Sequence, residues 1–253
     1  MAPLVTEAIV LHTFHYLETS LILRLMTRDV GTQSVLARGA RNSRKRFGSS
    51  LDLFAQGSAE LHMRPNRDLQ ALTGLDVTRA RPRLATDVGR FTAASMLAEL
   101  VMRCSSDEPS PGLFDAVEQS FDRIAAAEPG ETLEAALAGA WDVVSTLGFS
   151  PSVDRCANCD ALLDPESTVA FSHPAGGALC VRCARSVVGS RQLPSSARSA
   201  IRSWVQGGRA AGMSSIDARA HQRLLREFFQ EHVAGDRELR AYRVWEQGAW
   251  NVA

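Results

Sequence analysis

Residues 21–37 read LILRLMTRDVGTQSVLA and decide the N-terminal fold. Leu21, Leu23 and Leu25 alternate with other side chains, as they do on the buried face of a strand, and TQSVLA at 32–37 is a second strand-like run. Asp29 and Gly31 are turn-forming residues between the two runs. The stretch therefore predicts two strands joined by a turn.

Three more short strands are expected around this pair, at residues 5–14, 51–63 and 69–79. The last two are separated by RPNRD at 64–68, another turn-type cluster. Five strands without an intervening helix predict a small antiparallel barrel, because closure leaves no sheet edge exposed. The five-stranded barrel is the OB-fold, which often carries single-stranded nucleic acid. We expect this domain to occupy residues 1–83.

Helical periodicity follows after residue 83. Apolar stripes at helical spacing predict helices in residues 84–150 and again in 191–253, and we expect them to complete one bundle around an insert at 151–190. Thr86 or Asp87 is the expected cap of the first helix, Gly148 the end of the third, and Asp217 the cap of the last. The expected fold class is a multidomain α+β protein: an OB-fold barrel, a helical bundle domain and an inserted four-cysteine zinc element.

The composition excludes several classes of function. With 253 residues, 45% of them hydrophobic and 22% charged, the chain is typical of a globular protein. No uncharged apolar run approaches the roughly 18 residues that span a bilayer, and the N-terminus lacks signal-peptide features, so we expect a cytoplasmic protein without membrane contact. Lys45 is the one lysine, which argues against a phosphate-binding P-loop. No catalytic motif is present, and we expect no enzyme.

The net charge of zero hides a segregation along the chain. Residues 1–83 carry an excess of five positive charges and residues 84–150 an excess of eight negative charges. A basic domain attracts polyanions. The acidic side chains of the helical segment are expected to face water; they are Glu118, Asp122, Glu131, Glu134 and Asp142.

Two C-x₂-C pairs, CANC at 156–159 and CVRC at 180–183, are the strongest motif. Four thiolates satisfy tetrahedral Zn²⁺ with no open position, so the spacing predicts a structural zinc site held by Cys156, Cys159, Cys180 and Cys183. Residues 171–177, FSHPAGG, have the turn chemistry of a ribbon hairpin. A disulfide pair, a redox dithiol and an iron–sulfur cluster remain alternatives. Cys104 has no partner and is expected to be a small buried residue.

A basic cluster follows the strand at 32–37. Five basic residues lie within nine positions, and guanidinium groups there can grip phosphates while Phe47 stacks on a base. A solvated loop explains such a cluster equally well. Arg79, Arg81 and Arg83 add positive charges at alternate positions.

These residues together resemble the RecO family of bacterial recombination mediators. The resemblance is carried by YLETSL at 16–21, TRDVG at 27–31, ARGAR at 37–41 with SR at 43–44, LDLF at 51–54 and DL at 68–69. It continues through the helical part and both cysteine pairs, so it covers nearly the whole chain.

The resemblance implies a nucleoid-associated, non-enzymatic protein of DNA repair and homologous recombination. Such a protein binds single- and double-stranded DNA, anneals complementary strands and, with RecR, helps load RecA onto strands coated by the single-strand-binding protein, whose acidic tail is a further partner. The DNA-contacting residues carried over from the family are Arg38, Arg41, Arg44, Lys45 and Arg46, with Arg24, Arg79 and Arg81 as additions. The rival interpretations are a zinc-ribbon docking module of transcription or translation without DNA binding, and a thiol-redox enzyme using Cys156 and Cys159.

Overall fold

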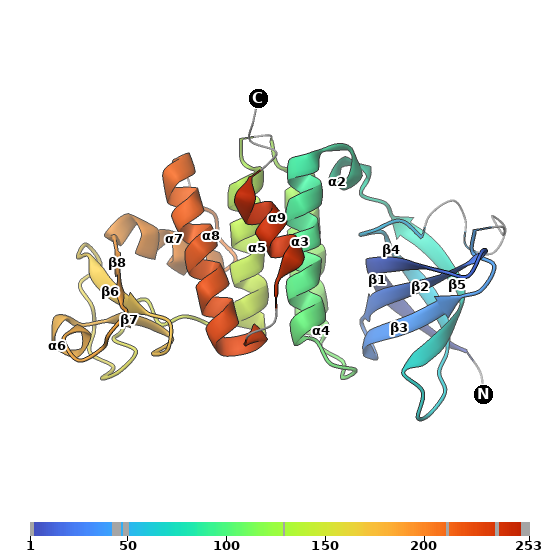
Figure 1. Ribbon diagram of the computed structural model, residues 1–253, viewed down its shortest axis with the longest axis horizontal. Helices are drawn as coiled ribbons and strands as arrows, with labels where there is room; N and C mark the ends of the chain where they lie inside the picture. The colour runs from blue at the N-terminus through green and yellow to red at the C-terminus, as the bar shows by residue number, and fades with distance from the viewer. Residues whose placement is uncertain are drawn as a thin grey trace. The chain divides into compact units, whose positions relative to one another are not determined.

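The computed structural model describes residues 3–41, 47, 51–128, 130–210, 213–235 and 238–248. The chain divides into two compact units, Met1–Ala126 and Ala127–Ala253 (Figure 1). Within the described ranges, no helix combines the length and the apolar character needed to cross a membrane.

The first unit contains a closed five-stranded barrel, which confirms the expected OB-fold. Its strands close in the order β1-β2-β3-β5-β4, and β3 and β5 form a parallel pair among otherwise antiparallel neighbours. All five expected strands are present. Their bounds are β1 (Leu4–Tyr16), β2 (Ser20–Thr27), β3 (Gly31–Ala37), β4 (Gln56–His62) and β5 (Leu69–Arg79).

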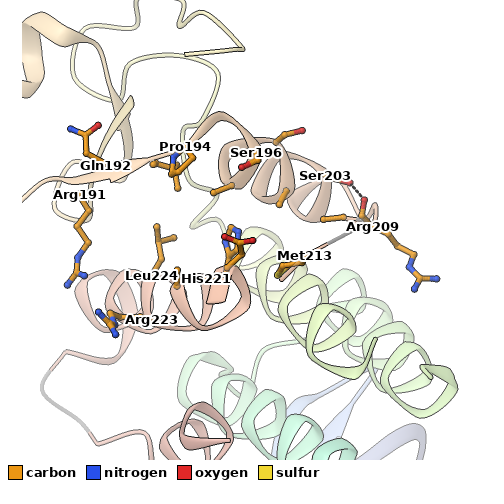
Figure 2. A pocket seen from close by; sticks show the side chains of 17 residues that line it. Arg191, Gln192, Pro194, Ser196, Ser203, Arg209, Met213, His221, Arg223 and Leu224 are labelled. Carbon is orange, nitrogen blue, oxygen red and sulfur yellow. Dashed lines mark hydrogen bonds between the residues drawn. The ribbon is translucent and has the colours of Figure 1, made fainter. Parts of the chain in front are cut away.

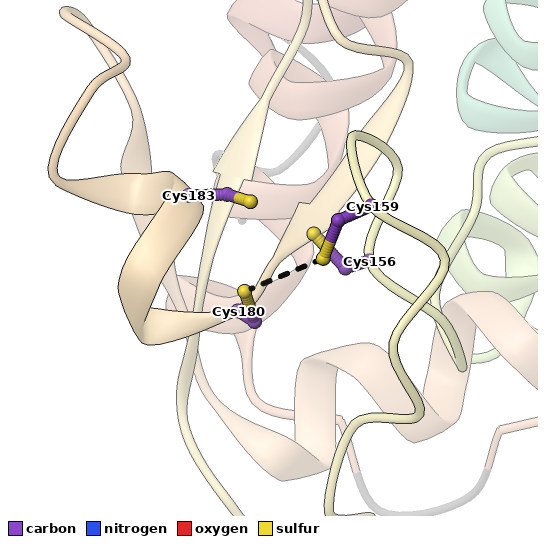
Figure 3. Close-up of side chains that lie close together, drawn as sticks. All are labelled: Cys156, Cys159, Cys180 and Cys183. Carbon is purple, nitrogen blue, oxygen red and sulfur yellow. Dashed lines mark hydrogen bonds between the residues drawn. The ribbon is translucent and has the colours of Figure 1, made fainter.

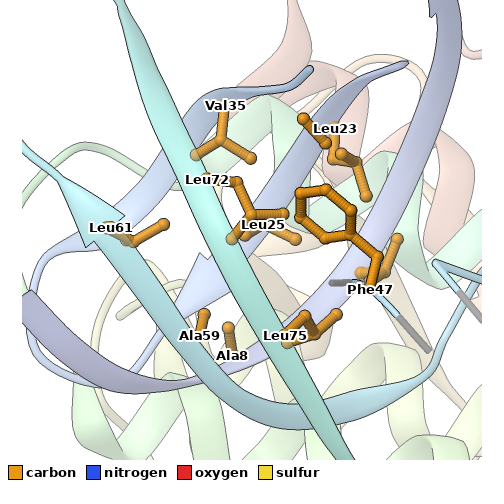
Figure 4. Close-up of a cluster of buried hydrophobic side chains, with 11 residues drawn as sticks. Ala8, Leu23, Leu25, Val35, Phe47, Ala59, Leu61, Leu72 and Leu75 are labelled. Carbon is orange, nitrogen blue, oxygen red and sulfur yellow. The ribbon is translucent and has the colours of Figure 1, made fainter. Parts of the chain in front are cut away.

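Alternating apolar side chains fill the barrel (Figure 4). Leu23, Leu25 and Val35 are fully buried there, as the alternation in residues 21–37 predicts. Gly31 begins β3 with φ +67°, and a Cβ atom at this position would lie 2.5 Å from the Ser106 carbonyl oxygen. The turn therefore needs glycine both for its backbone conformation and for the close approach of residue 106.

A β-bulge reverses the alternation of β1. Val10 pairs with Leu25, but the next paired residue is His12, opposite Arg24, so Leu11 is an extra residue on this strand. Before the bulge the even-numbered residues, such as Val10, face the barrel interior. After it the even-numbered residues face outward.

The described part of the first unit also contains the helices α2 (Pro82–Thr86), α3 (Val88–Cys104) and α4 (Pro111–Ala126). Asp87 caps α3, because its side chain accepts a hydrogen bond from the backbone nitrogen of Arg90 at 2.8 Å. The apolar stripe of α4 is buried as its spacing predicts, through Leu113, Val117, Phe121 and Ile124.

The second unit combines helices with a small three-stranded sheet of order β7-β6-β8. The predicted hairpin is confirmed by β6 and β7, which flank the turn at 173–176. The elements are α5 (Thr132–Thr146), β6 (Val169–Ser172), β7 (Gly177–Leu179), α6 (Val181–Ala184), β8 (Arg191–Leu193), α7 (Ser195–Val205), α8 (Ser215–Phe229), the π-helical turn η1 (Gln230–Ala234) and α9 (Arg240–Gln247).

Two expectations about the helices of this unit are wrong. Ser214, not Asp217, caps α8, and Asp217 completes a capping box three residues into the helix. The helix α8 is also not the last one, because α9 follows it and buries Tyr242 and Trp245. Gly148 lies just beyond α5 with φ +91°, as expected of a residue that ends a helix.

The helices expected to form one bundle are divided between the units. The helices α2 to α4 belong with the barrel, and α5 belongs with α7 to α9. Within the second unit, the Trp141 and Phe228 rings pack with centroids 5.3 Å apart. A bundle that spans both units stays a prediction.

Candidate metal centre and nucleic-acid interface

The two C-x₂-C pairs converge at one point of the second unit (Figure 3). The four sulfur atoms lie within 4.8 Å of one another, and the Sγ atoms of Cys159 and Cys180 are 3.8 Å apart. For Zn–S bonds of about 2.3 Å, tetrahedral geometry separates neighbouring sulfurs by about 3.8 Å. The donor set and its spacing therefore fit a tetrahedral metal ion.

Local backbone geometry aims these sulfurs inward. The Cys156 amide donates to the Ala161 carbonyl at 2.8 Å and closes the first knuckle, while the Ala157 amide donates to Ala178 in β7. Gly177 allows the chain to pack closely, since a Cβ atom there would lie 2.3 Å from the Ser152 carbonyl oxygen. The knuckle, β7 and the segment before the first cysteine are thus held as one element.

The electrostatics of the cluster favour a cation. Burial raises the pKa of Cys156, but hydrogen bonds from the backbone of Cys180, Asn158 and Cys159 outweigh it and bring the pKa to about 6. The Asn158 side chain lowers the pKa of Cys183, yet the sulfurs of Cys159 and Cys180 raise it to about 11. Four thiolates at this spacing therefore repel one another, and a divalent cation relieves the repulsion.

All five cysteines are free in this structure, and no disulfide bond joins any of the four clustered sulfurs. Cys104 is half-buried, and burial raises its pKa to about 12. A thiol with that pKa is a poor nucleophile at neutral pH, which agrees with the packing role expected from the sequence.

Two arginines of the expected DNA-contacting set lie exposed immediately after β3. They are Arg38 and Arg41. Arg41 is tied to the turn between β1 and β2, where its amide donates to the Thr19 carbonyl at 3.1 Å and its Nη1 to the Glu18 carbonyl at 3.0 Å. Arg44, Lys45 and Arg46 lie outside the described residues.

Arg24 lies on the outer face of β2. Its Nη1 donates to the Ser34 hydroxyl on the neighbouring strand, which holds the guanidinium against the sheet. Among the residues that the structure describes, no carboxylate oxygen lies within 4 Å of Arg24, Arg38 or Arg41. Their positive charges are therefore available to an external anion.

Arg81 is placed differently. Its side chain is 2% exposed, and it donates to the Phe54 carbonyl and the Gln56 amide oxygen, each at 2.8 Å, and to Asp122 at 2.7 Å. A buried guanidinium with three protein partners does not reach a phosphate. Arg81 is therefore left out of the DNA-contacting set proposed below.

Acidic residues of α4 pair with two further arginines of the barrel unit, Arg28 and Arg79. Arg79 pairs with Asp122 and, at 2.9 Å, with Glu118; Arg28 pairs with Asp115 at 2.8 Å. The hydrogen bond that Arg28 donates to Asp115 is the main cause that raises the pKa of Arg28. The expectation that Glu118 faces water is thus wrong, because the barrel and α4 are joined by these ion pairs.

Glu134 is a second departure from the expected water-facing set. Its carboxylate accepts hydrogen bonds from the Trp204 indole at 2.9 Å and the Ala210 amide at 2.7 Å. It therefore fixes the segment after α7 against α5 within the second unit.

The aromatic residue expected to stack on a base is not available for that role. Phe47 is 2% exposed and lies in the barrel core, so this expectation is wrong (Figure 4). The described strands of the barrel instead expose the rings of Phe14 and Tyr16 on β1, which are 47% and 42% exposed. Strand alternation alone could not reveal them, because the bulge at Leu11 sets their direction.

The second unit also holds a cavity of about 830 Å³ between β8, α7 and α8 (Figure 2). Apolar side chains such as Leu193 and Leu224 line it, and Arg191 and Arg223 lie at one end. His221 lies along its wall, packs edge-on against Trp204, and has a pKa lowered to about 4 by burial. Nothing in the sequence pattern marked this cavity.

Comparison with known proteins matches both units to the same protein family. The family model described as "Recombination protein O N terminal" matches residues 1–81, and "Recombination protein O C terminal" matches residues 85–241. The DNA repair protein RecO of Anaeromyxobacter dehalogenans is 35% identical over 244 residues, which is 94% of each chain. That of Geobacter sulfurreducens is 34% identical over 190 residues, 73% of this chain and 74% of the relative. The chain therefore belongs to the RecO family of DNA repair and recombination proteins, which are mediators and not enzymes.

Proposed function

We propose that this chain binds single- and double-stranded DNA through its barrel and anneals complementary strands. The observation that carries the proposal is that six arginines of the barrel unit fall into two sets. Arg28, Arg79 and Arg81 have carboxylate partners, whereas Arg24, Arg38 and Arg41 have none among the described residues. The second set leads directly into the basic run at 44–46.

Annealing follows from such a surface by simple electrostatics. Guanidinium groups neutralise the phosphate repulsion between two strands, and they do so without reading the bases. Base pairing itself then supplies sequence specificity, and no nucleotide hydrolysis is needed.

The test is binding of a fluorescent single-stranded oligonucleotide across a salt series, with annealing of its complement followed without ATP. Affinity should fall steeply with salt. The variant Arg38→Glu with Arg41→Glu should bind more weakly and show a shallower salt slope, because two phosphate contacts are lost. Arg219→Glu makes the same kind of charge change at an exposed position of α8 and should bind like the wild type. Unchanged affinity in the double variant would favour the zinc-ribbon docking module instead.

We further propose that the four cysteines hold a structural Zn²⁺. The sulfur spacing and the all-thiolate donor set support zinc, and four protein ligands leave no open position for catalysis. The test is metal analysis combined with thiol titration. One zinc per chain with four protected thiols supports the proposal; reactive thiols without zinc would support a redox dithiol, and bound iron would indicate an iron–sulfur cluster.

We propose that the protein partners are RecR, the acidic tail of the single-strand-binding protein and, indirectly, RecA, at the nucleoid in the cytoplasm. The cavity of the second unit suits an acidic, apolar tail, since Leu193 and Leu224 line it and Arg223 is exposed with no carboxylate within 4 Å in the described part of the chain. A labelled tail peptide should lose affinity for Arg223→Glu and keep it for Arg219→Glu. Equal binding by both variants would argue against this location.

Loading of RecA has its own measurement. RecA activity on single strands coated by the single-strand-binding protein should rise when this chain and RecR are added together. No rise with both proteins present would contradict the mediator role.

A further inference from the structure

The outer face of β1, β2 and β3 gathers aromatic and cationic side chains. Phe14 pairs with Ile22 across the sheet, and His12 pairs with Arg24. Directly opposite residues of an antiparallel pair lie on the same face. Since Leu23 and Leu25 fill the barrel interior, Arg24 between them faces outward, together with His12, Phe14 and Tyr16, which follow the bulge on β1.

Phe14 and Tyr16 are the exposed rings of this face. His12 packs edge-on against Phe14 with ring centroids 4.3 Å apart and an interplanar angle of 89°. This contact holds the Phe14 ring in place and leaves 47% of the residue exposed. The exposed parts of the two rings do not pack in the barrel core, so a ligand can contact them.

The spacing of the two rings suits an extended strand of nucleic acid. Residues two apart on a strand are separated by about 6.6–6.8 Å along it. Stacked bases of a duplex repeat at about 3.4 Å per strand, half that distance. Bases can therefore stack on both rings only when the strand is stretched and its bases are unpaired.

The charges beside the rings select an anionic ligand. Arg24 is held on this face by its hydrogen bond to Ser34, and Arg38 and Arg41 follow at the end of β3. Glu7, on β1 before the bulge, is paired with Arg28 at 3.0 Å, and Glu18 lies in the turn between β1 and β2. Positive charge therefore exceeds negative charge beside the exposed rings.

We propose that Phe14 and Tyr16 stack against unpaired bases, so that this face binds single-stranded nucleic acid in preference to a duplex. The inference rests on the proposed DNA binding and goes beyond it, because it names base-stacking residues and the strand form that they select. The phosphates on either side lie against Arg24 and Arg38. A duplex keeps its bases paired and reaches only the arginines.

The experiment compares the full chain with its Phe14→Ala, Tyr16→Ala double variant. An oligothymidine and a duplex of equal length are titrated by fluorescence anisotropy at several salt concentrations. Loss of base–aromatic stacking weakens single-strand binding by about fivefold or more for each ring removed. The slope of log affinity against log salt should stay unchanged, because no phosphate contact is lost, and duplex affinity should also stay unchanged.

Two controls separate stacking from folding. Phe14→Trp with Tyr16→Phe keeps both rings and should keep single-strand affinity. Val5→Ala removes another exposed apolar side chain from β1, 62% exposed, and should have no effect. If the double alanine variant unfolds at a lower temperature than the wild type, Tyr16→Ala alone makes the same test at the end of the strand.

The outcomes distinguish this inference from the proposed function. A wild-type chain that binds no DNA overturns both. A double variant that binds single strands like the wild type, or that loses single-strand and duplex affinity equally, overturns the stacking role alone. If single-strand binding is unchanged, the exposed rings would instead be assigned to contact with a protein partner.

Discussion

Replacing Asp122 by alanine should loosen the contact between α4 and the barrel. Asp122 accepts hydrogen bonds from both Arg79 and Arg81, and the Arg81 side chain is only 2% exposed. Without the carboxylate, the Nε atom of a buried guanidinium loses its charged partner.

The magnitude follows from the exposure of each partner. Removing one member of a fully buried ion pair costs about 3–5 kcal/mol, and an exposed pair contributes about 0–1 kcal/mol. Asp122 is 40% exposed and Arg81 keeps two other acceptors, so we expect an intermediate loss of about 1.5–3 kcal/mol. Asp115→Ala is the matched control: its pair with Arg28 has both side chains partly exposed, at 49% and 31%, and should contribute less than about 1 kcal/mol.

Hydrogen exchange measured on peptides from β4 and β5 is the appropriate assay, because it reports opening of the barrel separately from the second unit. The expected loss corresponds to exchange about 10- to 150-fold faster in Asp122→Ala. Asp115→Ala should differ from the wild type by less than about fivefold. Equal acceleration in the two variants, or a larger effect of Asp115→Ala, would refute the reasoning from burial.

Three further predictions concern other parts of the chain. Cys156→Ser should lower the bound zinc and the unfolding temperature, because metal ligation stabilises the fold, while DNA affinity measured by anisotropy changes by less than about twofold. Burial lowers the pKa of His221 to about 4, so the unfolded state binds a proton at higher pH than the native state does. The stability that comes from the neutral imidazole is therefore present above about pH 6.5 and is lost as pH falls towards 4. His221→Gln should therefore show a flatter dependence of unfolding free energy on pH across that window. Gly31→Ala should destabilise the barrel by more than about 2 kcal/mol in denaturant titration, because the new Cβ atom would clash with the Ser106 carbonyl. Gly39→Ala is the control: Gly39 has the same φ of +67°, but a Cβ atom there would have no neighbour within 4 Å, so the substitution should cost about 1 kcal/mol.

Local features of the chain were sufficient to predict much of this structure. The alternation of Leu21, Leu23 and Leu25 depends only on neighbouring residues, and these side chains take part in or pack against the barrel core. The two C-x₂-C pairs were equally informative, because each knuckle is closed by hydrogen bonds within a few residues. Helix ends were less certain: Ser214 and Asp217 are both good capping residues, and the sequence did not distinguish cap from capping-box partner.

The functional face depended on contacts between distant residues. Arg24 and Arg81 look alike in the sequence, yet Arg81 is buried against Asp122, which lies 41 residues away, and Arg24 faces outward. The stacking ring was misjudged for a similar reason, because barrel closure buries Phe47 and the bulge in β1 turns Phe14 outward.

The sequence by itself thus determined the OB-fold barrel, the cysteine cluster and the RecO family membership, since strand alternation, ligand spacing and motif order are properties of the linear chain. Only the tertiary structure decided which of the described arginines pair with a carboxylate and which of the described aromatic rings are exposed. The physical reason is that neutralisation and burial depend on strand register and on the packing of α4, and both bring together residues that are far apart in the chain.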